Sequence, residues 1–190
     1  MKIKLDINSV AVKQLESAIW MYAYDYDEVA VHTVAGAAFE IYTRRLKLST
    51  YKEDIKKYIK PEKTKDFTSL INKPYNFFKH GEHKHKELDY IEYDEEAVEM
   101  IIYLAAEANL LGDEKYKLSC AIIYRNFFAM KHPELFDIKS YDEYFLKPAA
   151  KLGLDPEAIK NKETLKVWLG SIGNTFLNGT NSPFRNVAPK

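Results

Sequence analysis

Residues 94–112 read DEEAVEMIIYLAAEANLLG, and this stretch decides the fold class. Val98, Ile101 and Ala105 recur at three- and four-residue spacing, the period with which one face of an α-helix repeats. Asp94 or an acidic neighbour is suited to cap the start, and Gly112 is suited to end the helix, because glycine readily adopts the left-handed conformation found there. We therefore predict an amphipathic helix that faces a core.

The same spacing extends to both sides of this helix. It predicts long helices over residues 10–25, 28–48 and 114–131, and shorter ones over 51–59, 67–78, 141–152, 156–160 and 163–177. Asn8 or Ser9 is suited to cap the first of them, and Asp27 the second. Residues 114–131 are apolar almost all round, as expected of a central helix that is buried on several sides and ended by Pro133. Pro74 removes a backbone donor, so the helix over 67–78 must kink or restart there.

The first residues have a different period. Residues 2–7 alternate apolar and charged side chains, which is typical of a half-buried strand or an extended arm, and residues 88–93 are a candidate partner strand. Residues 81–86, GEHKHK, form a polar loop by composition.

Together these patterns predict an all-α protein, a helical bundle of about five principal helices with a short extended N-terminal arm and a C-terminal helical extension. The predicted organisation is an arm over 1–9, the bundle over 10–132, a helical extension packed on the bundle over 133–177, and a flexible tail over 178–190.

Composition excludes several classes of protein. A single cysteine, Cys120, excludes an internal disulfide framework and a cysteine-based zinc site. No segment reaches the roughly 18 consecutive apolar residues of a transmembrane helix, and the first residues lack the apolar core of a signal peptide, so we expect a cytoplasmic protein with no membrane partner. The 28 basic and 28 acidic side chains give no net charge, so we expect no binding of long duplex DNA.

The charges are distributed unevenly. Residues 44–66 carry nine basic and four acidic side chains, whereas residues 87–99 carry seven acidic side chains and no basic one. A solvated surface accounts for this pattern. The alternatives are an anion-binding side formed by the basic stretch, or a dimer in which the two stretches meet.

The segment 72–85, NKPYNFFKHGEHKH, carries the first candidate site. In a helical projection its polar side chains lie opposite the apolar ones; they are Asn72, Asn76, Lys79 and His80. An amide, a fixed positive charge and a group that titrates near neutrality suit acid/base chemistry on a phosphate. The alternative is an ordinary wet surface.

A second candidate site lies on the predicted central helix, where Arg125 and Asn126 interrupt an apolar surface and His132 follows. A buried guanidinium needs a carboxylate or a bound anion as its partner. The candidate carboxylates are Glu40, Glu99 and Glu107. With a carboxylate partner Arg125 is structural, and with a bound anion it is a site residue.

A third candidate lies on the helix over 28–48, where His32, Gly36 and Glu40 follow one another at four-residue spacing and share a flank. Because Gly36 has no side chain, the gap admits either a neighbouring helix or a small ligand. A histidine that makes a helix contact in the core is the alternative.

We expect neither a metal site nor a cofactor. His80, His83 and His85 lie close together in the sequence, but their spacing matches no known metal cage. The glycine-rich, nucleophile-elbow and zinc-protease motifs are also missing from the sequence.

The order of these segments carries a resemblance. A helix containing VAVHTVAGAAFEIY at 29–42, then NFFKH at 76–80 with a polar loop, then an acid-capped helix is similar to a group of small, uncharacterised bacterial proteins, and the match covers residues 10–111. The layout also resembles HEPN domains, all-α bundles whose catalytic members are metal-independent ribonucleases marked by Arg-x4-6-His. Residues 125–132, RNFFAMKH, satisfy that pattern, whereas NFFKH has Asn76 where the pattern has arginine.

The resemblance implies a homodimer that brings its histidine-bearing helices together. A histidine would deprotonate the 2′-hydroxyl of RNA while an arginine or lysine stabilises the charge on the phosphate. It implies these roles for Arg125 and His132, or alternatively for Lys79 and His80. Many domains of this type only bind a partner, so a non-catalytic interaction module is an equal alternative, and a bundle that binds a small ligand beside His32 is a third.

Overall fold

The structure is a computed structural model of the chain. It describes residues 5–45, 60, 62, 73–74, 76–78, 80–83, 86–87, 90, 93, 95–151, 155 and 161–176. The helices predicted over 51–59 and 156–160, the start of the one over 67–78, the tail over 178–190, and the site residues Asn72 and Lys79 lie outside these ranges.

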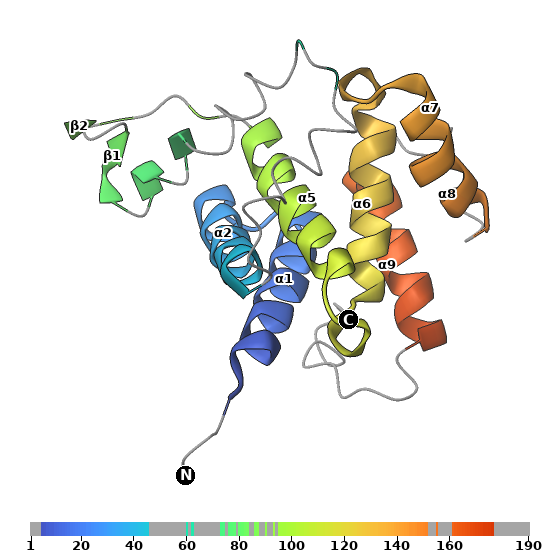
Figure 1. Cartoon of the computed structure of the whole chain (residues 1–190), viewed down its shortest axis with the longest axis horizontal. Helices are drawn as coiled ribbons and strands as arrows, with labels where there is room; N and C mark the ends of the chain where they lie inside the picture. Colours follow the sequence, from blue (N-terminus) through green and yellow to red (C-terminus); the bar gives the residue numbers. More distant parts are fainter. Residues whose placement is uncertain are drawn as a thin grey trace.

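The chain is an all-α helical bundle, as predicted (Figure 1). Its longer helices are α1 (Ile7–Ala23), α2 (Glu28–Arg45), α5 (Glu95–Leu111), α6 (Ser119–Lys131) and α9 (Lys162–Phe176). Between α6 and α9 lie the short helices α7 (Ile138–Tyr141) and α8 (Lys147–Lys151), joined by a π-helical turn over Asp142–Leu146.

Helix α1 begins earlier than predicted. Asp6, not Asn8 or Ser9, is its N-cap, and the Asp6 side chain accepts hydrogen bonds from the backbone N–H groups of those two residues at 3.0 and 3.1 Å. A carboxylate at this position also interacts favourably with the positive end of the helix dipole. The prediction of an extended arm over 1–9 is therefore wrong for residues 7–9, which are helical.

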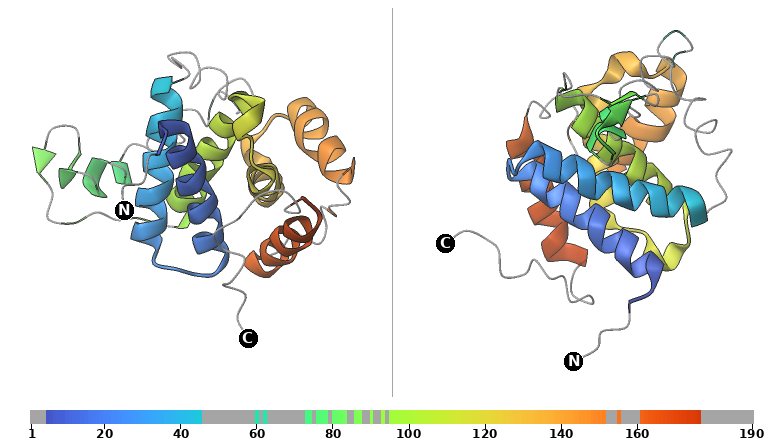
Figure 2. Two further views of the ribbon diagram at one scale, coloured as in Figure 1. Left: turned by 90° about the horizontal axis from the view of Figure 1, so that it is seen from below. Right: turned by 90° about the vertical axis from the view of Figure 1, so that its left-hand side faces the viewer.

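Helices α1 and α2 form an antiparallel pair, visible in the right-hand view of Figure 2. Asp25 reverses the chain between them with a φ of 56°, a left-handed conformation that Asp tolerates better than most residues. The predicted cap of α2 is confirmed, because the Asp27 carboxylate accepts a hydrogen bond from the backbone N–H of Ala30 at 2.9 Å.

Helix α5 lies at the centre of the bundle, with contacts to α1 and α2 on one side and to α6 on the other (Figure 1). Every residue from Ala97 to Ala106 is buried. The helix predicted as central, over 114–131, starts later than expected, because residues Glu114–Tyr116 form a separate 3-10 turn before α6. Helix α6 is buried on several sides, as predicted, because it packs on α1, α5 and α9, while α5 carries the longer unbroken run of buried residues.

The predicted polar loop contains a minimal antiparallel hairpin of β1 (Glu82–His83) and β2 (Lys86–Glu87). It follows Gly81, whose φ of 66° turns the chain away from the preceding helical residues. Among the helices that the structure describes, none is both long and apolar enough to cross a membrane.

Candidate functional site

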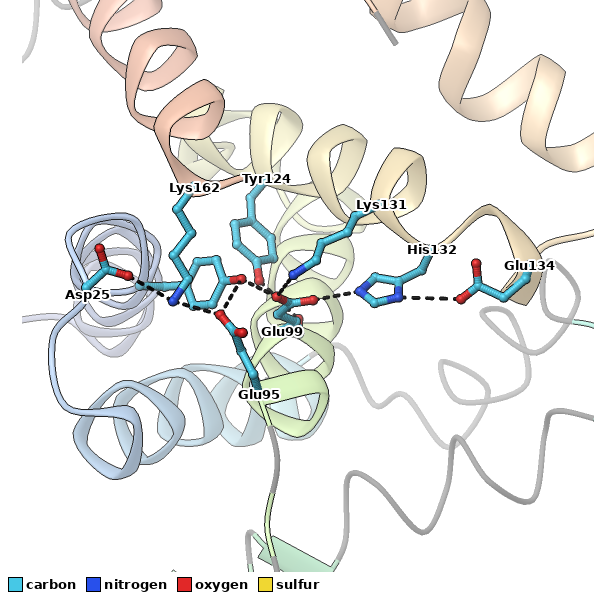
Figure 3. A network of polar contacts seen from close by, with 9 residues as sticks. Asp25, Glu95, Glu99, Tyr124, Lys131, His132, Glu134 and Lys162 are labelled. Atoms are coloured by element: carbon cyan, nitrogen blue, oxygen red, sulfur yellow. Dashed lines mark hydrogen bonds and ion pairs between the residues drawn. The ribbon is translucent and has the colours of Figure 1, made fainter. Parts of the chain in front are cut away.

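A buried carboxylate, Glu99 in the central helix α5, is the centre of a polar network (Figure 3). Its side chain is 1% exposed and contacts three donors from two other parts of the chain. Tyr22 from α1 and Lys131 from α6 each hydrogen-bond Oε1, while Nε2 of His132 lies 2.6 Å from Oε2. The ends of α1 and α6 therefore meet at this one side chain.

Glu99 is ionised at neutral pH. Burial by itself raises the pKa of its carboxyl, but hydrogen bonds from His132, Lys131 and Tyr22 outweigh this effect and hold the pKa below its ordinary value. Burial raises the pKa of the Tyr22 hydroxyl, and the neighbouring Tyr124 and the Glu99 carboxylate raise it further. Tyr22 therefore keeps its proton and acts as a donor to Glu99.

His132 lies where α6 ends, one residue before Pro133. Its side chain is 12% exposed, and its ring packs against Phe128 with 4.7 Å between centroids. Because Glu99 is a hydrogen-bond acceptor, Nε2 carries the proton and Nδ1 holds the lone pair when the ring is neutral. Nδ1 is 3.5 Å from the carboxylate of Glu134, whose side chain is 59% exposed.

The network continues to the C-terminal helix α9 through Tyr22. Nζ of Lys162 lies 2.7 Å from Glu95 and 3.0 Å from Asp25, and 4.4 Å from the centre of the Tyr22 ring. The Tyr22 hydroxyl lies 3.3 Å from Glu95. Burial lowers the pKa of Lys162, but its hydrogen bonds to Glu95 and Asp25 raise it by more, so Lys162 is charged.

Arg125 belongs to a different cluster. Its Nε lies 3.7 Å from Glu107 Oε1, and its guanidinium lies 5.7 Å from the centre of the Phe145 ring. This confirms the predicted carboxylate partner and selects Glu107. Arg125 and His132, the two ends of the Arg-x4-6-His pattern, therefore pair with different carboxylates.

Burial gives Glu107 unusual acid/base behaviour. It raises the pKa of the Glu107 carboxyl to about 7, although the charge of Arg125 and a hydrogen bond with Tyr103 act in the opposite direction. Glu107 is thus partly protonated at neutral pH.

Of the predicted pair Lys79 and His80, the structure describes only His80. His80 is exposed and Asn76 is half-buried, while Lys79 and Asn72 lie outside the described residues. No contact among the described residues joins His80 to the Glu99 network.

The remaining predicted ligand-binding residues lie apart from that network. His32 on α2 is fully buried, while Glu40 on the same helix pairs with Arg44. Asn126 is also fully buried, and its amide donates a 2.8 Å hydrogen bond to the backbone oxygen of Ile122. In the described part of the chain, no group of three or more His, Cys, Asp or Glu side chains is arranged to hold a metal ion.

Most of the network was missed from the sequence. The members not assigned there to a site are Tyr22, Asp25, Glu95, Tyr124, Lys131, Glu134 and Lys162, and Glu99 was considered only as a partner of Arg125. A signal for Glu99 does exist, because it is a charged residue on the buried side of an otherwise apolar helix. No family model, curated protein or solved structure matches the chain.

Proposed function

We propose that this protein binds RNA and cleaves it by metal-independent acid/base chemistry, with His132 as the general base and Lys131 as the phosphate-binding cation. The observation that carries the proposal is the buried Glu99 carboxylate, which holds both side chains at the end of one helix. A buried carboxylate that fixes the orientation of an imidazole is a recurrent arrangement in acid/base catalysis.

In this proposal Nδ1 of His132 accepts the proton of the RNA 2′-hydroxyl. The 2′-oxygen then forms a bond to phosphorus, the bond from phosphorus to the 5′-oxygen breaks, and the leaving oxygen takes a proton from water. Lys131, with 34% of its side chain exposed, faces both solvent and Glu99 and stabilises the charge that develops on the phosphate. This role requires the exposed Glu134 side chain to release Nδ1 when the substrate binds.

The resemblance to HEPN domains supports the same reaction class. It assigns the cation to Arg125 or to Lys79, whereas the geometry favours Lys131, because Arg125 pairs with Glu107 and Lys131 shares Glu99 with His132. The resemblance and the geometry agree on one point: the catalytic histidine ends a helix of an all-α bundle and follows a basic residue. A chain with one cysteine needs no oxidising compartment for an internal disulfide, which supports a cytoplasmic location.

The test is incubation of a labelled single-stranded RNA with the purified chain in EDTA. We expect cleavage to continue in EDTA and to fall at least about 100-fold in His132→Ala. Lys131→Gln should also lower the rate of RNA cleavage. His80→Ala is the matched control, because His80 is exposed and lies outside the network.

Other outcomes would contradict this proposal. Loss of cleavage in His80→Ala with full cleavage in His132→Ala would place the catalytic histidine in the NFFKH segment. An intact protein, folded by circular dichroism, that leaves the RNA uncut would reject the nuclease.

A homodimeric interaction module is the second candidate. Three large side chains around the turn between α1 and α2 are exposed, namely Tyr24 (40%), Tyr26 (56%) and Val29 (45%). Neighbouring exposed apolar side chains favour contact with another protein surface. Light scattering coupled to size exclusion tests this: we expect a dimer that Tyr26→Asp with Val29→Asp converts to a monomer, and a monomeric wild-type chain would contradict it.

A further inference from the structure

His32 is a buried imidazole with no polar partner among the residues that the structure describes. The residue is fully buried on α2, and neither Nδ1 nor Nε2 has a hydrogen-bond partner within the described part of the chain. Leaving two polar atoms unsatisfied in an apolar environment is costly, and such groups in native proteins call for an explanation.

Two aromatic rings of the described residues contact His32. The ring of Phe78 lies 5.1 Å away and the ring of Tyr93 lies 5.9 Å away, both nearly perpendicular to the imidazole. These two rings also contact each other at 5.0 Å, and the Tyr93 hydroxyl donates a 3.2 Å hydrogen bond to the backbone oxygen of Glu28. Phe78 and Tyr93 therefore pack on α2 around the imidazole.

Gly36 lies on the same flank of α2 as His32, one turn later. A helical side chain covers the turn that precedes its own Cα, so the residue four positions after His32 would normally cover the imidazole. That residue is Gly36, which is buried and has no side chain to do so. Glycine at such a position lets a ligand approach the backbone closely.

We propose that His32 is the recognition group of a binding site for an uncharged, planar nitrogen heteroaromatic molecule, a class that includes the nucleobases and nicotinamide. A neutral imidazole offers one N–H donor and one lone-pair acceptor, which matches the adjacent acceptors and donors on the edge of such a ring. The rings of Phe78 and Tyr93 supply aromatic contacts to the faces of the ligand. This site shares no residue with the Glu99 network.

The charge state of His32 supports an uncharged ligand. Burial lowers the pKa of the imidazole to about 4, so it carries no positive charge at neutral pH with which to bind a phosphate or carboxylate. The nearby Glu40 carboxylate pairs with Arg44 on the same helix, so it does not make His32 part of a charged site.

The experiment uses the full chain labelled with 15N in its five histidines. Two-bond proton–nitrogen spectra resolve the two nitrogens of each imidazole, and the loss of one pair of signals in His32→Phe assigns those of His32. The probes are adenine, guanosine, cytidine, uridine and nicotinamide up to their solubility, and separately a single-stranded RNA of mixed sequence. Thermal unfolding is recorded in parallel.

We expect at least one probe to displace the His32 nitrogen signals and, at ten times its Kd, to raise Tm by about 3 °C or more. Both effects should vanish in His32→Phe and persist in His80→Ala, and Phe78→Ala should weaken binding about tenfold or more. A response to the free compounds identifies a small molecule as the ligand, whereas a response to RNA alone identifies a base within a strand.

The wild-type chain by itself can overturn the proposal, whatever the folding of the variants. If no free compound and no RNA displaces the His32 signals, the site does not bind this class of molecule. If a probe raises Tm equally in His32→Phe, it binds elsewhere and the proposal also fails. Neither result depends on RNA cleavage at His132.

Discussion

Burial of the Glu99 carboxylate carries a large desolvation cost, which is offset by donors from Tyr22, Lys131 and His132. Each of these donors reaches Glu99 from a helix other than α5, or from the residue that ends such a helix. Removal of one donor leaves the buried negative charge less well compensated, so the stability of the whole bundle depends on each contact.

The Tyr22 hydroxyl provides a sharp test of this dependence. Tyr22→Phe removes one donor to Glu99 while the ring keeps its packing, so we expect the free energy of unfolding to fall by about 1.5–3 kcal/mol in urea titrations. Tyr24→Phe is the matched control, because Tyr24 is 40% exposed and should change stability by no more than about 0.5 kcal/mol. Equal effects of the two substitutions would show that Glu99 does not need Tyr22.

At the scale of elements, α9 is attached to the bundle by two kinds of contact. Leu165, Trp168 and Leu169 are buried apolar residues on one face of this helix, which packs on α6 and α1. Lys162, its first residue, adds ion pairs to Asp25 and Glu95 and a contact with the Tyr22 ring. The apolar face supplies most of the burial, and Lys162 fixes the helix start beside the Glu99 network.

Replacement of Lys162 should therefore loosen α9 before it unfolds the bundle. In Lys162→Met we expect amide exchange in α9 to become about tenfold faster, because loss of the ion pairs and the cation–π contact costs about 1–2 kcal/mol. Lys139→Met is the control, since Lys139 is exposed on α7. Unchanged exchange in α9 of Lys162→Met would show that the apolar face alone fixes this helix.

At the scale of the whole molecule, two buried groups give opposite contributions to stability as pH changes. Burial lowers the pKa of His32 from 6.5 to about 4, so the unfolded chain binds a proton at a pH where the folded chain does not. The stability that His32 contributes is thus lost as pH falls through this interval. Burial raises the pKa of Glu107 from 4.5 to about 7, so its contribution is lost as pH rises through that interval.

Single substitutions should separate these two contributions. We compare the free energy of unfolding of each variant with that of wild type between about pH 4.5 and 6.5. As pH rises through this interval, the difference should move against His32→Phe by about 2–3 kcal/mol, because only wild type gains stability from the neutral imidazole. It should move in favour of Glu107→Gln by a similar amount, because only wild type loses stability as Glu107 ionises. Urea unfolding at a series of pH values measures both trends. The depressed pKa of Glu99 affects all three proteins alike, so it cancels in the comparison. If the free energy of unfolding changed with pH in the same way in all three proteins, the pKa shifts of His32 and Glu107 would be contradicted.

The amino-acid sequence by itself determined the longer helices that the structure describes, because helix formation depends on the local three- and four-residue spacing of apolar side chains and on capping residues such as Asp27. It also determined that Arg125 needs an anionic partner, since a guanidinium cannot be buried alone. Asp6 was missed as the cap of α1 because residues 2–7 also fit the two-residue period of a strand.

Only the tertiary structure decided which side chains meet. Glu99 is 77 residues from Tyr22 and 33 from His132 along the chain, and nothing in their local spacing links them. Arg125 and His132 are close in sequence, yet they contact different carboxylates. The physical reason is that helix packing selects partners by the faces that the assembled bundle buries, so a site built from several helices is fixed by the relative placement of those faces rather than by neighbours in the chain.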